Sequence, residues 1–336
     1  MTTIRDVAKN AGVAPITVSR VINDSGYVSE STRKRVEDAI EKLGYVPNML
    51  GPSLRFKQTM SLALVLTDIT NPFWTTVARG VEDVAQANGY SIILCNTDES
   101  EAKQEQYLNM LLRRRIDGII LVPAKCVPAP IYTIQQQDIP VVLLDRQIPG
   151  LGVDIVRADS ESGAYQLTEY LLSLGHRQIT MLAGPKTVST AVDRVSGYRR
   201  ALAAAGLSEE AADIYWGNFT LDSGREMARR ALSANPQLTA FFAANNFIAI
   251  GVIQTLRELG MAVPDDIALV TVDDFPPVFT IDPFLTVANQ PAREMGQQAA
   301  KLLLGRVTGE LETECQHIIL PTQMIVRASS GHSVVS

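Results

Sequence analysis

The sequence IRDVAKNAGVAPITVSRVIN, at residues 4–23, decides the fold of the N-terminal part of this chain. Its first half places apolar side chains on one face of a helix, at Ile4, Val7, Ala8 and Ala11. Gly12 follows at the point where a left-handed residue ends a helix, and Pro15 suits the first turn of the next one. Val18 and Ile22 are spaced to turn this second helix back toward the first. The stretch therefore predicts a helix-turn-helix unit.

A third helix is predicted directly after this pair. Ser29 to Thr32 reads as a capping sequence, and an apolar stripe follows at Val36, Ala39, Ile40 and Leu43. The stripe would close a three-helix core, with Gly44 ending the helix. A bare helical hairpin is the simpler interpretation of residues 4–23, but a complete three-helix unit favours insertion of the second helix into a DNA major groove.

Four motifs, DVAKNAGV, TVSRVIN, VSESTRKRV and GYVPN, occur in this order and closely resemble the LacI/GalR (lactose-repressor) family of bacterial transcription regulators. The resemblance implies a helix-turn-helix domain at 1–46, a hinge at 47–59 and an effector-binding and dimerisation core at 60–336. It also implies a cytoplasmic homodimer, in which a small effector changes the affinity for a pseudo-palindromic operator in double-stranded DNA. A repressor is the commoner arrangement in the family.

The resemblance assigns DNA contacts by position. Pro15, Ile16 and Arg20 occupy the base-reading positions, where Arg20 could bind a guanine and Ile16 could offer only apolar contact. The other residues expected to contact DNA, mainly its backbone, are Thr3, Thr17, Ser19, Asn23, Tyr45 and Asn48. Ala14 departs from the Ser that usually caps this helix in the family.

The hinge departs further from the family. Leu54 stands at the position of the minor-groove wedge, but Gly51 and Pro52 replace the usual Ala and Arg of a short hinge helix. Pro inside a helix costs about 3 kcal/mol and Gly about 1 kcal/mol. We therefore expect a hinge helix that starts later or forms poorly, and weaker operator binding or a different operator centre.

Charge and cysteine content agree with these expectations. The net charge is −6, but residues 1–58 hold nine Lys and Arg against six Asp and Glu, so they carry +3 and the remainder −9. The basic excess lies where phosphate contacts would need it. No apolar run is long enough for a membrane span, and we expect no signal peptide. Cys95, Cys126 and Cys315 are expected to be buried thiols in a reducing compartment.

Short apolar runs alternate with helical patterns after residue 60. Strands are expected at 62–66, 91–94, 118–122, 141–144, 179–183, 240–243, 267–272 and 316–320. Continuous apolar strands separated by helices predict an α/β core with parallel sheets. We expect two doubly wound lobes of the periplasmic-binding-protein type, lobe one at about 60–159 and 290–325 and lobe two at about 160–289.

Polar and aromatic residues follow the ends of these strands, where ligand clefts form in such folds. The candidate effector-binding residues are Phe73, Trp74, Asp145, Arg146, Arg194, Phe219, Asn245, Asp273 and Gln290. Aromatic faces can stack on sugar rings, while carboxylate, guanidinium and amide groups bind hydroxyls. The set is similar to that of ribose-type binding proteins and favours a monosaccharide such as a pentose. A single Asp after a strand is more often a helix cap, and Phe73 or Trp74 could simply be core.

Other interpretations stay open. A purine, a sugar phosphate or a protein partner could replace the sugar, and an enzyme or a sugar-binding protein could use the same core. Neither a GxSxG, GxGxxG or HExxH motif nor a Walker A loop is present, so no enzyme is expected. No cofactor and no metal site are expected. His176 is interpreted as structural.

Overall fold

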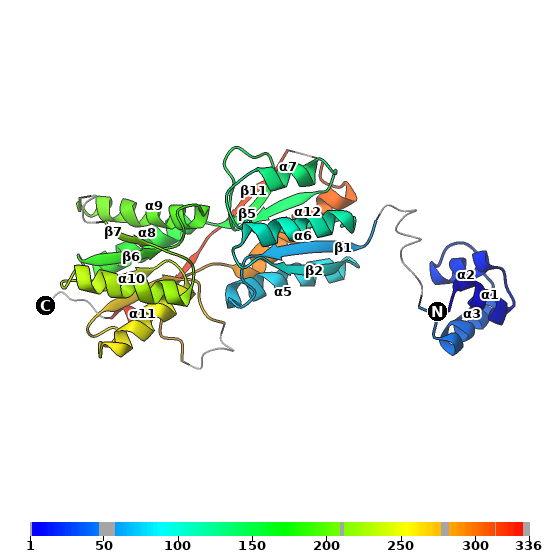
Figure 1. The fold of residues 1–336 in the computed structure, drawn as a ribbon, viewed down its shortest axis with the longest axis horizontal. Helices are drawn as coiled ribbons and strands as arrows, with labels where there is room; N and C mark the ends of the chain where they lie inside the picture. Colours follow the sequence, from blue (N-terminus) through cyan, green and yellow to red (C-terminus); the bar gives the residue numbers. More distant parts are fainter. Residues whose placement is uncertain (1, 47–57, 209–211, 277–281, 313, 332–336) are drawn as a thin grey trace. The chain divides into compact units, whose positions relative to one another are not determined.

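A computed structural model describes residues 2–46, 58–208, 212–276, 282–312 and 314–331 (Figure 1). The chain divides into two compact units, Met1–Thr59 and Met60–Ser336. The hinge residues Asn48, Gly51, Pro52 and Leu54 lie outside the described residues.

The small unit is a three-helix bundle of α1 (Ile4–Ala11), α2 (Pro15–Ile22) and α3 (Glu30–Leu43). Thr3 and Asp6 form a capping box at the start of α1, and Gly12 ends that helix with a φ of 65°. The core is made of Val7, Ala8, Ala11, Val18, Val21, Val36 and Ala39. The predicted hairpin and third helix are both present.

Two details of the small unit differ from expectation. Val21 is buried on α2, whereas Ile22, expected as the second anchor, is only half-buried at the edge of the core. Because a helix turns by about 100° per residue, Val21 and Ile22 lie on either side of the line along which α2 contacts the core. Val21 lies nearer to that line. Ser29 does not cap α3 with its side chain, because its hydroxyl donates to Thr32 Oγ1 at 2.9 Å.

The large unit contains two six-stranded sheets, one in each lobe. The first sheet has the order β11-β5-β4-β3-β1-β2 and the second β12-β10-β9-β8-β6-β7. The first sheet comprises β1 (Ser61–Leu66), β2 (Ser91–Asn96), β3 (Gly118–Leu121), β4 (Val141–Leu144), β5 (Asp154–Ala158) and β11 (His317–Leu320). The second comprises β6 (Ile179–Ala183), β7 (Asp213–Trp216), β8 (Ala240–Ala243), β9 (Ala268–Val272), β10 (Thr286–Asn289) and β12 (Gln323–Ile325). All pairings are parallel except that of β12 with β10.

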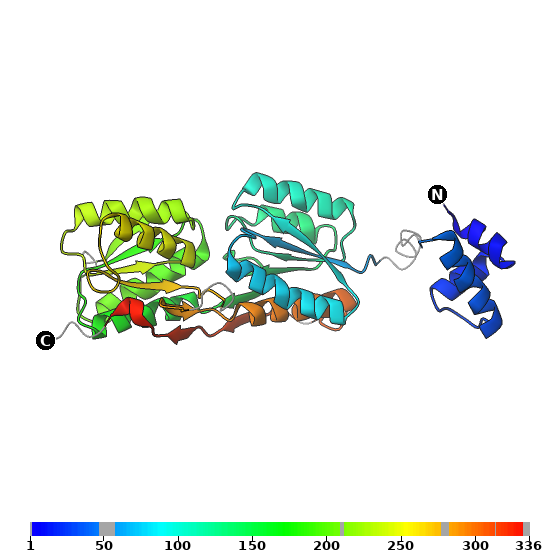
Figure 2. The same cartoon turned by 90° about the horizontal axis from the view of Figure 1, so that it is seen from below.

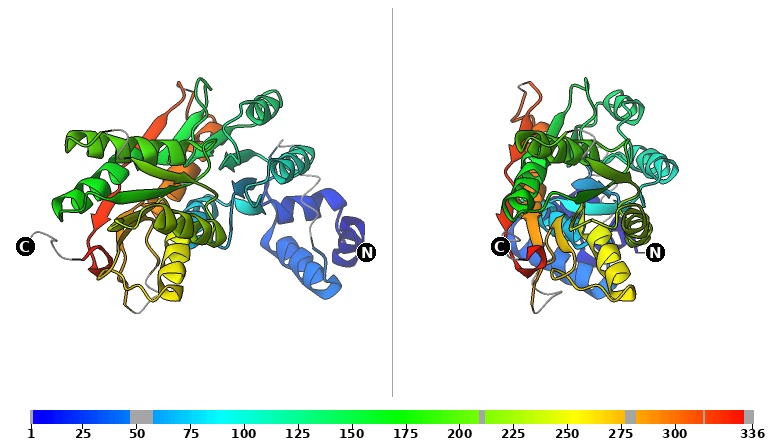
Figure 3. Two further views of the ribbon diagram at one scale, coloured as in Figure 1. Left: turned by 60° about the vertical axis from the view of Figure 1, so that its left-hand side comes forward. Right: turned by 90° about the vertical axis from the view of Figure 1, so that its left-hand side faces the viewer.

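Helices cover both faces of each sheet (Figures 1 and 3). In the first lobe they are α5 (Pro72–Ala87) and α12 (Ala292–Thr308) on one face, and α6 (Glu101–Arg113) and α7 (Ala129–Gln135) on the other. In the second lobe α8 (Ser160–Ser173) packs on α9 (Ser189–Ala204), and α10 (Leu221–Ala234) packs on α11 (Asn246–Glu258). A short 3₁₀ helix, Ala328–Ser330, follows β12. The predicted two-lobed α/β architecture is confirmed.

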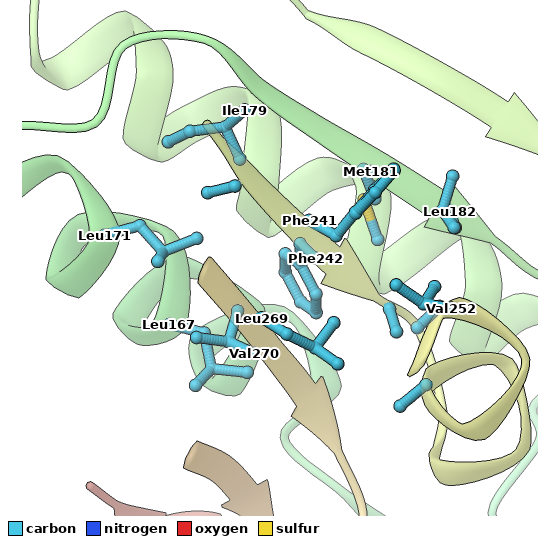
Figure 4. Close-up of a cluster of buried hydrophobic side chains, with 14 of the residues drawn as sticks. Leu167, Leu171, Ile179, Met181, Leu182, Phe241, Phe242, Val252, Leu269 and Val270 are labelled. Atoms are coloured by element: carbon cyan, nitrogen blue, oxygen red, sulfur yellow. The ribbon is translucent and has the colours of Figure 1, made fainter. Parts of the chain in front are cut away.

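Strand β1 shows why its sequence is apolar throughout. Leu62, Leu64 and Leu66 face α5 and α12, while Ala63 and Val65 face the α6 and α7 side. Because successive side chains of a strand point to opposite faces, a strand with helices on both sides needs apolar residues at every position. Figure 4 shows the equivalent core of the second lobe, where Phe241 and Phe242 of β8 are both fully buried.

The end of the chain corrects the expected division between lobes. Residues 290–325 were all assigned to lobe one, but β12 pairs with β10 in the second sheet. Figure 2 shows the segment from β11 to β12 running from one lobe to the other. The strands β5, β7, β10 and β12 were not expected from the sequence. Each is short and contains polar residues, as in Asp154–Ala158 and Asp213–Trp216, so none forms a continuous apolar run.

The cysteines also differ from expectation. Cys95 is buried, Cys126 is half-buried and Cys315 is exposed, so only one of the three is a core thiol. Cys315 lies between α12 and β11, two residues before β11, and is exposed to solvent. His176 is buried, with Nδ1 3.0 Å from Thr239 Oγ1. Among the described residues, no helix is long and apolar enough to cross a membrane.

Candidate functional site

The outer face of α2 presents the residues expected to read DNA bases. Pro15, Ile16 and Arg20 are all exposed, and Ile16 exposes 59 % of its surface although it is a large apolar residue. Val18 and Val21 hold the opposite face of the helix in the core. An apolar side chain left in solvent on such a face is suited to contact with a thymine methyl group.

Other predicted DNA contacts already have partners inside the small unit. Thr3 Oγ1 donates to Asp6 at 2.7 Å, and Asn23 Nδ2 donates to the Ser19 carbonyl at 2.8 Å. Tyr45 packs partly against the three-helix core. Thr17 and Ser19 are half-buried. These residues can contribute to a DNA surface only through the atoms that these contacts leave accessible.

A cavity of about 570 Å³ lies between the two lobes of the large unit. All nine candidate residues line it, although Arg194 lies inside α9 and not before a helix: Phe73, Trp74, Asp145, Arg146, Arg194, Phe219, Asn245, Asp273 and Gln290. The structure thus brings together residues that are up to 217 positions apart, because parallel strands end at the edge of each sheet that faces the other lobe.

Asp145 and Asp273 occupy equivalent places in the two lobes. Asp145 follows β4 and its amide donates to Val156 of β5 at 2.8 Å, whereas Asp273 follows β9 and donates to Ala288 of β10 at 3.2 Å. Both have left-handed backbones, with φ of 65° and 70°. Non-glycine residues pay strain energy for such a conformation, which is common at functional sites. Each carboxylate is only 5 % exposed.

Burial governs the protonation of these carboxyls. It raises the pKa of Asp145 to about 6, although Arg194 and Arg146 oppose the shift. Burial also raises the pKa of Asp273, against the opposing effects of Arg194 and of the hydrogen bond from Gln290. Buried carboxylates of this kind favour ligands that donate hydrogen bonds to them.

Five buried polar atoms of the lining residues have no hydrogen-bond partner among the described residues: Thr67 Oγ1, Asp145 Oδ1, Arg146 Nε, Arg194 Nε and Gln290 Oε1. Arg194, on α9, uses Nη1 to donate to the Ala244 carbonyl at 2.8 Å. Gln290 Nε2 donates to Asp273 Oδ1 at 2.6 Å. The open positions are two acceptors, two guanidinium donors and one hydroxyl, and a ligand hydroxyl group can satisfy each kind.

Aromatic rings form the apolar part of the cavity wall. Phe73 and Trp74, in the first turn of α5, meet edge to face with centroids 4.7 Å apart. Phe219 lies across the cavity on the second lobe, with the Arg194 guanidinium 5.8 Å from its ring centre. Such faces can stack on the C–H side of a sugar or on a planar base.

Sequence reasoning missed several lining residues. Glu99 follows β2 and Asn71 precedes α5, while Thr190 lies in the first turn of α9. The rule that selected Asp145, a polar residue after a strand, would also have selected Glu99, which lies three residues beyond Asn96. Asn245 also caps α11, because its side-chain oxygen accepts from the Ile248 amide at 2.9 Å. The same residue therefore caps a helix and lines the cavity.

Within the described part of the chain, no group of three or more His, Cys, Asp or Glu side chains is arranged to hold a metal ion. Of the cavity carboxylates, Glu99 pairs instead with the Arg146 guanidinium, and Asp273 accepts from the Gln290 amide.

Two family models cover nearly the whole chain. The model described as bacterial regulatory proteins, lacI family, matches residues 3–48. The model described as periplasmic binding proteins and sugar binding domain of LacI family matches residues 59–328. The chain belongs to the LacI family of bacterial regulatory proteins. It is therefore a transcriptional regulator, as the four motifs predicted.

Individual relatives agree with this family. The chain is 36 % identical to the ribose operon repressor of Halalkalibacterium halodurans, covering 98 % of this chain and 97 % of the relative. It is 35 % identical to the HTH-type transcriptional repressor PurR of Photobacterium profundum, covering 91 % and 92 %. The lac repressor dimer bound to operator and the anti-inducer ONPF is 26 % identical, with a TM-score of 0.85 and coverage of 98 % and 99 %.

Proposed function

We propose that this LacI-family regulator represses transcription by binding an operator as a homodimer, and that a free monosaccharide, a pentose in particular, binds between its lobes and changes operator affinity. The observation that carries the effector proposal is the convergence of carboxylate, guanidinium, amide and aromatic side chains on one cavity. The protein acts in the cytoplasm, and the cavity binds its ligand without catalysis.

The unpartnered atoms of the cavity support a polyol. Asp145 Oδ1 and Gln290 Oε1 need donors, Arg146 Nε and Arg194 Nε need acceptors, and the Thr67 hydroxyl can serve as either. Neighbouring ring hydroxyls supply both from one small molecule, while Phe73, Trp74 and Phe219 offer apolar faces to the ring. Sequence identity alone does not select the effector, because relatives named ribose operon repressor and PurR are almost equally similar.

The helical unit supports the DNA part of the proposal. Pro15, Ile16 and Arg20 are available to base edges, and Thr17, Ser19 and Asn23 lie beside them for phosphate contacts. Thr3, Tyr45, Asn48 and Leu54 complete the proposed DNA-binding set. Half-sites about one helical turn apart would place two α2 helices in successive major grooves. The solved lac repressor relative is a dimer on its operator, which supports this arrangement.

A thermal-shift screen of the full chain tests the effector. The panel contains free pentoses and hexoses, sugar phosphates and purines, each in large excess. A ligand at 100 times its Kd stabilises the native state by about 2.7 kcal/mol. We expect one free monosaccharide to raise the melting temperature, and Asp273→Ala and Arg194→Ala to remove that shift.

The same ligand is then added to the chain bound to DNA duplexes selected from a random pool. A change in DNA affinity with the free sugar supports the coupling, and its sign separates inducer from corepressor. Shifts with purines or sugar phosphates alone would contradict the free-sugar effector while leaving DNA binding intact. Failure to enrich any duplex would contradict the repressor proposal.

A further inference from the structure

Arg146 and Glu99 form a two-pronged ion pair in the wall of the cavity. Arg146 Nη1 donates to Glu99 Oε2 and Nη2 to Glu99 Oε1, both at 2.6 Å. Nη1 also donates to the Pro123 carbonyl at 3.0 Å. The Arg146 side chain is only 3 % exposed, whereas Glu99 exposes 36 %. Three of the five N–H groups of Arg146 are used in this way, and Nε, which has no hydrogen-bond partner among the described residues, lies 3.9 Å from the Asp145 carboxylate, so little of the guanidinium is left for a ligand anion.

The loop that carries Glu99 is built to hold it there. Asp98 and Glu99 both have left-handed backbones, with φ of 50° and 57°. The Glu99 amide donates to the Thr67 carbonyl at 3.2 Å, and Thr97 Oγ1 donates to the Leu66 carbonyl at 3.1 Å. These bonds tie the loop to the end of β1. Two consecutive strained residues persist only where the surroundings determine them.

The residues that line the cavity carry more negative than positive charges. The lining carboxylates are Asp68, Asp98, Glu99, Asp145 and Asp273, against the guanidinium groups of Arg146 and Arg194. Arg146 is neutralised by Glu99, and Arg194 lies among carboxylates. A phosphate or carboxylate on a ligand would therefore meet net repulsion in a site of low dielectric.

We propose that Glu99 is a specificity-determining residue, which occupies the guanidinium of Arg146 and thereby restricts the cavity to uncharged polyols, excluding phosphorylated and carboxylated sugars. This inference rests on the proposed function in one respect, namely that the ligand is a sugar. The role of Glu99 in excluding anionic ligands is a separate claim. Without the Glu99 carboxylate, the guanidinium groups of Arg146 and Arg194 would both be available to an anion.

The test titrates the full chain with D-ribose, D-ribose 5-phosphate and inorganic phosphate, using calorimetry and thermal shift. The variant Glu99→Gln keeps the shape of the side chain and removes its charge. We expect the wild-type chain to reject both phosphate compounds. Glu99→Gln should bind them about tenfold or more tightly than wild type, because a like charge has been removed beside the anion.

Three further variants isolate the cause. Glu99→Asp keeps the charge and should still reject phosphate compounds. The double variant Glu99→Gln, Arg146→Gln should lose the gain, since the freed guanidinium is gone. Glu101→Gln makes the same change of charge two residues away, at an exposed side chain paired with Lys125 outside the cavity lining, and should behave as wild type.

The outcomes separate the two proposals. Equal binding of D-ribose and D-ribose 5-phosphate by the wild-type chain would overturn the role of Glu99. So would a Glu99→Gln chain that is folded by circular dichroism and binds inorganic phosphate no better than wild type. If Glu99→Gln gains phosphate binding while the wild-type chain ignores every free sugar, the charge selection stands and the monosaccharide effector fails.

Discussion

Asn71 and Asn246 exchange two side-chain hydrogen bonds, each of 3.0 Å, from one lobe of the large unit to the other. Asn71 precedes α5 and also caps it, accepting from the Phe73 amide at 3.0 Å, while Asn246 begins α11 and is fully buried. Each amide donates to the other's oxygen. The pair therefore joins the lobes beside the cavity and stabilises one relative placement of them.

Asn246→Ala should destabilise the large unit by about 1–3 kcal/mol, because it leaves the buried Asn71 amide nitrogen without its acceptor. Denaturant unfolding followed by circular dichroism measures the change. Asn109→Ala, at an exposed position of α6, is the control and should alter stability by less than about 0.5 kcal/mol. Equal effects of the two variants would show that the bond pair contributes nothing specific.

Effector affinity should depend on pH through Asp145. Burial raises the pKa of this carboxyl to about 6 in the ligand-free chain. A ligand hydroxyl that donates to the carboxylate favours its ionised form, so affinity should be full above about pH 7 and decrease as the pH falls through 6. The limiting slope for one proton is about tenfold per pH unit.

Calorimetry between pH 5 and 8 measures this dependence. Burial also raises the pKa of Asp273, and the charge of Asp273 contributes to the raised pKa of Asp145, so both carboxyls can shape the profile. Asp145→Asn should bind more weakly and flatten the profile. A wild-type affinity that is constant from pH 5 to 8 would exclude hydroxyl donation to this carboxylate.

Gly80→Ala should destabilise the first lobe by about 1–3 kcal/mol, because the added methyl group overpacks the contact between two helices. A Cβ at Gly80, on α5, would lie 2.1 Å from the Arg293 carbonyl oxygen of α12, so the two helices would have to separate. Gly152→Ala is the matched control, since a Cβ there meets nothing within 4 Å. Thermal unfolding compares the variants, and a Gly80→Ala chain as stable as Gly152→Ala would contradict this helix packing.

The lining of the cavity could be predicted from the sequence because one geometric rule governs it. Residues such as Asp145 and Asp273 directly follow apolar strands, and the ends of parallel strands meet at one edge of a sheet. Glu99 also follows a strand, but Asn96, Thr97 and Asp98 separate it from the last apolar residue of β2, so the rule does not tell which of these polar residues lines the cavity. The left-handed backbones of Asp98 and Glu99, which shape this loop, could not be predicted from the sequence pattern.

The fold was predictable where apolar runs are uninterrupted, as in the four-residue strands β4 and β8. Strand β1 has alternate residues facing different helices, and this makes its sequence apolar at every position. Strand β12 has only three residues and pairs antiparallel to β10, so neither its length nor its pattern marks it. On α2, Val21 and Ile22 are equally apolar, and only packing against α1 and α3 decides which is buried.

Arg20→Ala should weaken operator binding by about 1–3 kcal/mol and relax base preference at one position of each half-site. Arg20 is exposed on α2, and its side chain lies 4.0 Å from where a Cβ would stand at Gly26. Ser19→Ala should instead weaken binding to all duplexes alike. Anisotropy titrations against single-base variants of a selected operator distinguish the two patterns, and an unchanged preference in Arg20→Ala would remove it from the base-reading set.

The double variant Gly51→Ala, Pro52→Arg should tighten operator binding by about tenfold or more. Both changes replace poor helix residues at hinge positions that lie outside the described residues, and Pro alone costs about 3 kcal/mol inside a helix. A hinge helix that forms more readily would place Leu54 at the minor groove with a smaller loss of conformational entropy on binding. Anisotropy titration at one fixed salt concentration measures the change, with effector binding to the large unit as the control. An affinity that stays constant or falls would show that this hinge binds DNA without the helix.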